Sequence, residues 1–237
     1  MMTSLIIGCS SGIGFELAKK LIERNNKIIG VARREENLLA LKGINPEKIV
    51  VYALDITEEK GVDKIKSILK NNNDFDQIIF SAGYGDLNEK LNEIIELETI
   101  NLNVTAFTQI MCLGYDYFKQ KGKGHLIAIT SIAGIRGNKL APSYNATKAY
   151  QLNYLEGLMQ KASNENNKIA ITDVRPGFVD TAMAKGDHLF WVASPQKAAE
   201  QILNAILKKN KIVYITKRWF LIALILKILP KWLYLKL

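Results

Sequence analysis

Cysteine and histidine are scarce in this sequence, and their scarcity excludes several classes of protein. The 237 residues include two cysteines, Cys9 and Cys112, which have no paired spacing. Without disulfide pairs, or a charged and then apolar leader, we expect a cytoplasmic protein. The two histidines, His125 and His188, lack metal-ligand spacing to each other or to a cysteine. We therefore expect no metal site and no Ser/His/Asp triad.

Acidic residues are missing from the C-terminal end. The net charge is +9, yet residues 201–237 hold eight Lys or Arg and no Asp or Glu, which leaves 24 basic against 23 acidic residues elsewhere. A near-neutral main part argues against a nucleic-acid partner. Because the chain can bury one substantial core, we expect one domain over residues 1–216, followed by a basic, apolar tail over residues 217–237.

Short apolar runs alternate with segments of helical periodicity. Runs without apolar and polar alternation are typical of strands buried on both faces of a parallel sheet. Helical crossovers between them predict a doubly wound, Rossmann-type α/β fold of three α/β/α layers with about seven strands. Asp55 and Ser194 are expected to cap the helices that they precede. The expected strands are 5–7, 28–31, 49–52, 78–80, 126–129, 169–174 and 212–215, and the expected helices are 13–25, 57–71, 90–120, 143–162 and 194–208.

A glycine-rich stretch, Gly8-Cys9-Ser10-Ser11-Gly12-Ile13-Gly14, follows the first expected strand and opens the first expected helix. Helix N-termini bind phosphate groups because their backbone N–H groups are free and the helix dipole is positive there. Gly8 would allow a tight turn, Gly12 a close approach of the backbone to a pyrophosphate, and Gly14 close packing of helix on sheet. The two serines would add hydroxyl donors. The stretch therefore predicts dinucleotide binding.

This stretch resembles the motif Gly-x-x-x-Gly-x-Gly of the classical short-chain dehydrogenase/reductase superfamily, and the resemblance spans roughly residues 4–215. The family's Asn-Asn-Ala-Gly after the fourth strand is Phe80-Ser81-Ala82-Gly83 here, so both asparagines are replaced. Ile7 stands where the family usually has threonine. The resemblance implies an NAD(P)-dependent oxidoreductase that acts on a small-molecule carbonyl or alcohol. It also implies a homo-oligomer, a dimer or tetramer.

Four residues match the family's catalytic positions. Tyr144 and Lys148 are four residues apart on an expected helix, so they share one face, and the ammonium is expected to lower the pKa of Tyr144 from its reference of about 10. Ser131 precedes Tyr144 by thirteen residues, as in the family. By resemblance, Tyr144 exchanges a proton with the substrate oxygen, Ser131 hydrogen-bonds that oxygen and Lys148 binds the nicotinamide ribose. Asn101 would hold a water in a proton relay behind the lysine.

A second Tyr-x-x-x-Lys pair, Tyr115 and Lys119, has the same spacing. Leu102, not a serine, lies thirteen residues before Tyr115. We therefore expect Tyr115 to be an interface or core residue.

The end of the second expected strand indicates which cofactor is used. Arg33 and Arg34 follow it, where an acid would select NAD and a basic residue would pair with the 2′-phosphate of NADP. We favour NADP(H), with NAD(H) as the alternative. Asp55 matches the family's adenine contact and is also the expected helix cap. The resemblance places these further residues at the cofactor: Ile13, Ile56, Ala82, Gly83, Pro176, Gly177, Val179 and Thr181.

The tail supports two interpretations. Lysines among Trp, Tyr and Leu over residues 219–237 are typical of a segment in the interface of an anionic membrane, at its cytoplasmic face. Alternatively, the tail packs on a neighbouring subunit or closes the substrate pocket. Lys227, Pro230 and Lys231 interrupt the apolar run, so a spanning helix is not expected.

The substrate class is inferred from one segment of the sequence. Residues 182–193 are expected to form an apolar lid, which favours a lipophilic ketone, aldehyde or alcohol. A catalytically inactive cofactor-binding protein, or a membrane-surface interaction protein on the same fold, is the alternative. The joint presence of Ser131, Tyr144 and Lys148 argues against an inactive protein. The chain length and the glycine spacing disfavour a sugar epimerase.

Overall fold

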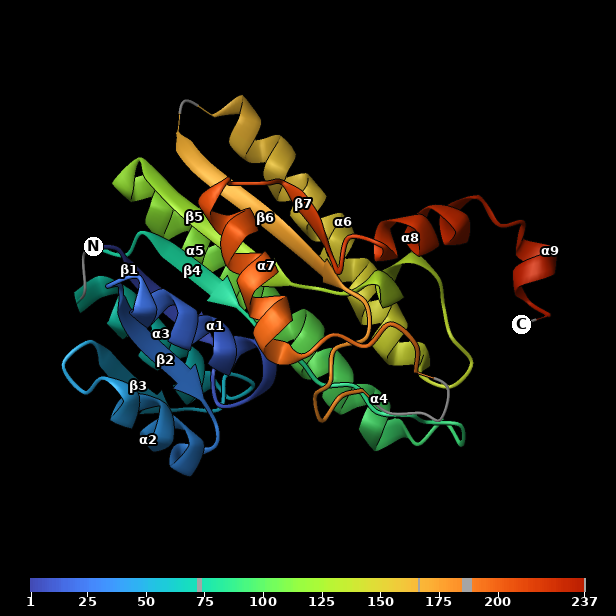
Figure 1. Ribbon diagram of the computed structural model, residues 1–237, viewed down its shortest axis with the longest axis horizontal. Coiled ribbons are helices and arrows are strands. Elements are labelled where there is room, and N and C mark those ends of the chain that lie inside the picture. Colours follow the sequence, from blue (N-terminus) through green and yellow to red (C-terminus); the bar gives the residue numbers. More distant parts are fainter. Residues whose placement is uncertain (72–73, 166, 185–188, 237) are drawn as a thin grey trace.

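A single parallel sheet forms the centre of the molecule. The computed structural model describes residues 1–71, 74–165, 167–184 and 189–236. The sheet has seven strands in the order β3-β2-β1-β4-β5-β6-β7, with helices on both of its faces (Figure 1). This confirms the predicted fold class and every predicted strand. The strands are β1 (Thr3–Ile7), β2 (Lys27–Ala32), β3 (Ile49–Ala53), β4 (Gln77–Phe80), β5 (Lys123–Ile129), β6 (Lys168–Pro176) and β7 (Ile212–Ile215).

The apolar strands are buried on both faces because helices form a layer on each side. Successive side chains of a strand point to opposite faces, and both Leu5 and Ile6 of β1 are fully buried. Leu5 belongs to a core cluster that includes Phe107, whereas Ile6 belongs to a second cluster with Leu17 and Ile202. Each cluster fills the space between the sheet and one helical layer, which explains why the strands lack polar alternation.

The helices up to α7 follow the predicted segments, with two differences, and α8 and α9 come after the last predicted helix. The segment predicted as one helix over 90–120 contains α4, a π-helical turn over Asn101–Ala106, and α5. The helix α2 was not predicted, and its N-cap, Arg34, makes no side-chain capping bond. The helices are α1 (Gly12–Glu23), α2 (Glu35–Ile44), α3 (Glu59–Asn71), α4 (Glu93–Ile100), α5 (Phe107–Lys121), α6 (Pro142–Asn164), α7 (Pro195–Leu207), α8 (Trp219–Ile228) and α9 (Lys231–Tyr234).

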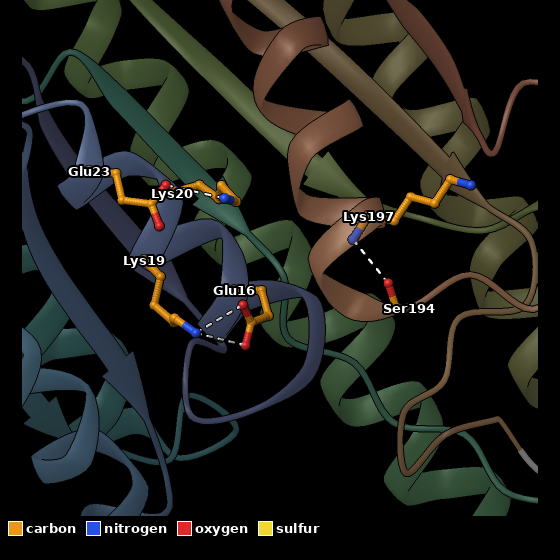
Figure 2. A network of polar contacts seen from close by, with 6 residues as sticks. All are labelled: Glu16, Lys19, Lys20, Glu23, Ser194 and Lys197. Atoms are coloured by element: carbon orange, nitrogen blue, oxygen red, sulfur yellow. Dashed lines mark hydrogen bonds and ion pairs between the residues drawn. The ribbon is translucent and has the colours of Figure 1, made fainter.

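Local capping fixes where α7 begins. The Ser194 hydroxyl accepts a hydrogen bond from the Lys197 backbone N–H at 3.2 Å, which confirms the predicted cap. Figure 2 shows this cap beside α1, whose surface carries ion pairs between residues three apart. In the first pair, Lys19 Nζ lies 3.2 Å from Glu16 Oε2. Such surface pairs contribute little to stability, so the packing of α1 and α7 on the sheet holds this layer together.

Two further helices follow the last strand. Figure 1 shows α8 and α9, in red, extending past the sheet on the side where the C-terminus lies. Within the described part of the chain, no helix combines the length and the apolar character that a membrane crossing requires.

Candidate active site

A cavity of about 940 Å³ opens at the carboxyl ends of the strands. The strand order reverses between β1 and β4, and ligands of doubly wound folds bind at such a switch point. All predicted site residues except Gly14 and Asn101 line this cavity. The structure therefore brings together side chains from loops after β1, β2, β3, β4, β5 and β6.

The glycine stretch after β1 lets a ligand approach the backbone closely at the start of α1. Gly8 and Gly12 have φ angles of +90° and +58°, which favour glycine. A Cβ on Gly8 would lie 2.4 Å from the Ala82 nitrogen, and one on Gly14 would lie 2.1 Å from the Gly8 oxygen. Ser11, the N-cap of α1, makes no side-chain capping bond. The first N–H groups of α1 are therefore available to an anion, and the stretch fits a dinucleotide pyrophosphate.

The two arginines after β2 reach different parts of this stretch. The Arg34 guanidinium donates to the hydroxyls of Ser10 and Ser11 at 3.1 and 2.6 Å. Arg33 is largely exposed, and its Nη1 lies 3.7 Å from Asp55 Oδ2. The cavity edge beside the first helix thus carries two cations.

Asp55 faces both the cavity and the turn before α3. Its Oδ1 accepts hydrogen bonds from the backbone N–H and the hydroxyl of Thr57, at 2.9 and 2.7 Å. Partial burial raises the pKa of Asp55, but the Thr57 hydrogen bonds and the Arg33 charge outweigh it and hold that pKa below its ordinary value. Asp55 therefore caps the turn before α3, which begins only at Glu59 and not at the predicted residue 57, and it is also a lining residue of the cavity.

Ser131 and Tyr144 meet beyond the end of β5. The Ser131 hydroxyl accepts the Ala133 N–H at 3.0 Å and lies 3.5 Å from the Pro176 oxygen, which fixes its direction. Tyr144 stands in the first turn of α6, half-buried. Burial raises the pKa of Tyr144 above its ordinary value, and a hydrogen bond with the Ser131 hydroxyl opposes this rise. At neutral pH, Tyr144 is therefore a protonated phenol that can donate to an oxygen.

The environment of Lys148 differs from the prediction. Its Nζ donates to the Ile129 oxygen at 3.3 Å and to Gln151 Oε1 at 3.0 Å, and lies 5.8 Å from the Tyr144 ring centroid. Burial lowers the pKa of Lys148 to about 8, although the nearby Asp173 carboxylate raises it. The ammonium is thus directed at carbonyl oxygens rather than at the phenol, and the expected lowering of the Tyr144 pKa is not found.

A buried amide lies behind Lys148. Gln151 is 1% exposed, and its Nε2 donates to the Asn103 backbone oxygen at 2.8 Å. Gln151 therefore connects Lys148 to the π-helical turn. The signal for it was Gln151's position three residues after Lys148 on the same helix.

The structure corrects the assignment of Asn101. Its side chain is exposed and lies outside the cavity lining. Asn103 is fully buried instead; its Oδ1 accepts the Tyr84 N–H at 3.0 Å and its Nδ2 donates to the Thr147 hydroxyl at 3.1 Å. The two asparagines lie two residues apart in the π-helical turn, one exposed and the other buried. Asn103 holds the Tyr84 loop against α6.

Two other residues at the site escaped the sequence analysis. A Cβ on Gly85 would lie 2.2 Å from Tyr144 Cδ2, so the backbone of Gly85 packs directly on the ring. Asp173 is fully buried on β6, with its Oδ2 2.6 Å from Arg175 Nε. Burial raises the pKa of Asp173 despite the Arg175 charge. Gly85 could have been suspected from its neighbour Gly83, whereas Asp173 lies inside an apolar run.

The loop after β6 closes the cavity opposite the glycine stretch. A Cβ on Gly12 would lie 3.1 Å from Thr181 Cγ2, so the two loops face each other closely. Gly177 packs under the Trp219 indole, where a Cβ would lie 2.1 Å from Cε2. Val179 forms an isolated bridge with Ala193, at the far end of the predicted lid over 182–193. Residues 185–188 of that segment lie outside the described residues. Pro176 ends β6 and lines the cavity.

The second Tyr-x-x-x-Lys pair and His125 lie away from the cavity. The Tyr115 hydroxyl donates to Glu165 at 3.0 Å, and Lys119 pairs with the same carboxylate, so this second Tyr-x-x-x-Lys pair is structural. His125 is buried, with its Nε2 2.8 Å from the Thr172 hydroxyl. His188 lies outside the described residues. Within the described ranges, His, Cys, Asp and Glu form no group of three that could hold a metal.

The sequence matches a family and several curated relatives. Residues 2–189 match the family model described as short chain dehydrogenase. An uncharacterized oxidoreductase of Staphylococcus epidermidis is 29% identical over 191 residues, which cover 77% of this chain and 80% of that one. A protein of Dictyostelium discoideum, described as dehydrogenase/reductase SDR family protein 7-like, is 33% identical over 75% of this chain and 58% of its own length.

Solved structures share the whole architecture. The bulky-bulky ketone specific alcohol dehydrogenase from Comamonas testosteroni superposes with a TM-score of 0.82 and 25% identity, covering 94% of this chain and 90% of its own. A short-chain dehydrogenase from Sphingobium yanoikuyae, in complex with NADPH, gives a TM-score of 0.84 at 24% identity over 94% and 92% of the two chains. The second likeness concerns the fold alone.

Proposed function

Because the chain belongs to the short-chain dehydrogenase/reductase family, we propose that it is an NADPH-dependent reductase of lipophilic ketones and aldehydes. The family and the oxidoreductase relatives establish the coarser activity, a nicotinamide-dependent oxidoreductase of CH–OH and C=O groups. The cofactor preference, the substrate class and the residue roles are the proposal.

The residues around the cavity fit a nicotinamide dinucleotide. The N-terminus of α1 and the glycine stretch would hold the pyrophosphate, and Lys148 the nicotinamide ribose. Ala82 and Gly83, Ile13 and Ile56, and Thr181 with its loop would form the remaining walls. When bound, this cofactor supplies the hydride that reduces a carbonyl.

Tyr144 and Ser131 would act on the substrate oxygen. The protonated Tyr144 phenol donates its proton to the oxygen as negative charge develops there. The Ser131 hydroxyl, which opposes the rise in the pKa of Tyr144, would stabilise the same oxygen. Both side chains line one cavity with Lys148. This shared placement of the three is the observation that carries the proposal, and it disfavours an inactive protein.

The preference for NADPH rests on Arg33 and Arg34. Guanidinium groups bind phosphate through paired hydrogen bonds, and both arginines line the cavity at the end of β2. Asp55 would be an acidic competitor, but its carboxylate is engaged by Thr57 and faces Arg33. The local charge therefore favours a ribose that carries a 2′-phosphate.

The substrate end of the cavity is apolar. The lining residues there include Phe178, Met183, Phe190, Trp219, Ile222 and Leu226. Such a lining favours a large carbonyl compound with little polarity. The relative from Comamonas testosteroni is named for bulky ketones, in accord with this choice.

The cofactor preference is tested by fluorescence titration with NADPH and with NADH. We expect NADPH to bind at least about tenfold more tightly. The double variant R33A/R34A should lose this difference by weakening NADPH binding alone, whereas R24A, an exposed arginine at the end of α1, should keep it. Tighter binding of NADH by the unchanged protein would overturn the preference.

Assembly into a homo-oligomer, which the family suggests, stays a prediction. Size-exclusion chromatography of the purified chain would test it.

A further inference from the structure

The helix α8 has two apolar faces, and one of them belongs to the cavity. Trp219, Ile222 and Leu226 line the cavity and recur at helical spacing. Arg136 holds this face in place, because its Nε donates to the Leu226 oxygen at 2.7 Å and its Nη2 donates to the Leu229 oxygen. The inward face of α8 is therefore packed against the rest of the chain and held there by hydrogen bonds.

The outward face of α8 has no such cover. Its large apolar residues are between about half and three-quarters exposed, and Ile228 is 72% exposed. The same surface continues along α9, where Leu235 is 71% exposed. We call this surface the outer face; its residues are Phe220, Leu221, Leu224, Ile225, Ile228, Trp232, Leu233 and Leu235.

The segment that carries the outer face has charges of one sign. No Asp or Glu occurs in residues 201–237. Two of the cations lie over aromatic rings, Arg218 at 4.9 Å from the Trp191 centroid and Lys236 at 5.7 Å from that of Trp232. An apolar helical face bordered by cations and Trp is complementary to an anionic lipid interface. The cations of the border are Lys217, Arg218, Lys227, Lys231 and Lys236.

The inward side of α8 contacts the loop over the cavity. Phe190 and Trp191 are 48% and 40% exposed, and both rings pack on Trp219 with centroids 5.1 and 5.8 Å away. Trp219 itself is buried and lines the cavity. The helix that carries the outer face therefore also contacts, through Trp219, residues at the substrate end of the cavity.

We propose that the outer face docks on an anionic membrane surface, and that the cavity takes up its carbonyl substrate from that membrane. A second copy of the chain is the weaker occupant, because a symmetric contact through this patch would bring cations against cations. The docking is inferred from the exposed residues and charges of α8 and α9 alone, whereas the uptake of substrate rests on the proposed function.

Vesicle sedimentation tests the docking. The full chain should sediment with vesicles of phosphatidylcholine and phosphatidylglycerol, remain free with phosphatidylcholine alone, and be released by high salt. L221S/L224S should reduce binding about tenfold or more. These side chains are 57% and 47% exposed. The matched control L39S/I44S changes similarly exposed residues of α2, 54% and 46%, and should bind normally.

Three outcomes would overturn the docking: no binding to the anionic vesicles, equal loss in both double variants, or conversion of an oligomer to a smaller species by L221S/L224S. The last would make the outer face a subunit interface. Uptake is tested by NADPH oxidation with a ketone dissolved in the vesicles and with a water-soluble ketone. Anionic vesicles should raise the rate for the first ketone only, and L221S/L224S should remove that increase. Binding without reduction of any ketone would reject the proposed function and leave the docking supported.

Discussion

At the scale of single residues, the site combines a neutral acid with a weakly basic lysine. Burial raises the pKa of Tyr144 and lowers that of Lys148 to about 8. The phenol therefore keeps its proton at neutral pH, and Lys148 loses its charge as the pH rises through about 8. Activity that depends on the ammonium should fall on that alkaline limb. Burial sets the position of this limb and the Asp173 carboxylate opposes it. Gln151, in direct contact with Lys148 Nζ, is a neighbour at which a change of charge should move the limb.

Substitution of Gln151 should move this alkaline limb in two directions. A carboxylate in Q151E would stabilise the ammonium and raise the pKa of Lys148 by about one unit or more. Q151L removes an acceptor and should lower it. The pH profile of kcat/KM measures this shift. Q151E also loses the hydrogen bond that the Gln151 amide donates to Asn103, so its overall rate should drop. Unshifted profiles in both variants would show that Gln151 does not act through Lys148.

Acid stability should depend on His125. Burial, with a smaller effect of the Lys209 charge, lowers the pKa of His125 to about 4 from 6.5. The contribution of the neutral imidazole to the free energy of unfolding is fully present above pH 6.5. It decreases as the pH falls toward 4, and the loss reaches up to about 3 kcal/mol. H125Q should be less stable at pH 7 but lose less stability between pH 6.5 and 4. Urea unfolding at both pH values measures this, and parallel losses in the two proteins would refute it.

At the scale of elements, uninterrupted apolar runs predicted the strands, because burial on both faces of the sheet requires apolar residues at successive positions. The helix α2 was missed because its buried side reduces to Leu38 and Leu41, and Arg34 gives no side-chain cap. Asn101 was chosen over Asn103 because only packing decides which side of a helical turn is buried. The π-helical turn at this point changes the rotation between residues, which no periodicity in the sequence marks.

The loop after β4 should prove to be a support for Tyr144. G85A would place a Cβ 2.2 Å from the Tyr144 ring, so the ring must move and kcat should fall about tenfold or more. NADPH binding, which uses other walls of the cavity, should persist. The control G157A lies on the same helix as Tyr144 with nothing within 4 Å of its Cβ, and should retain activity with slightly higher stability. Full activity of G85A would contradict this packing.

At the scale of the whole molecule, the tail belongs to the cavity wall. The sequence of the tail is compatible with contact to a membrane, a subunit or the pocket, because an apolar run does not reveal which of its faces is covered. The structure seats Trp219 on the loop after β6, where Gly177 leaves room for the indole. The segment most distant in sequence from the glycine stretch thus encloses the same cavity.

That enclosure makes a prediction about stability. G177A would put a Cβ 2.1 Å from the Trp219 ring and should displace α8, at a cost of about 1–3 kcal/mol. Thermal unfolding, with tryptophan fluorescence as the probe, measures the loss. G43A, whose Cβ would meet nothing within 4 Å, is the control. An unchanged melting temperature in G177A would mean that α8 does not pack on this loop.

The central claim is that Tyr144 protonates a carbonyl oxygen in an NADPH-dependent reduction. It is tested most directly by Y144F, assayed for NADPH oxidation with a bulky apolar ketone and, in parallel, for NADPH binding by fluorescence. The phenyl ring preserves the shape of the site and removes the acid. We predict a fall in kcat of about 10²–10⁴ with NADPH binding unchanged. Turnover by Y144F at nearly the wild-type rate would contradict the account.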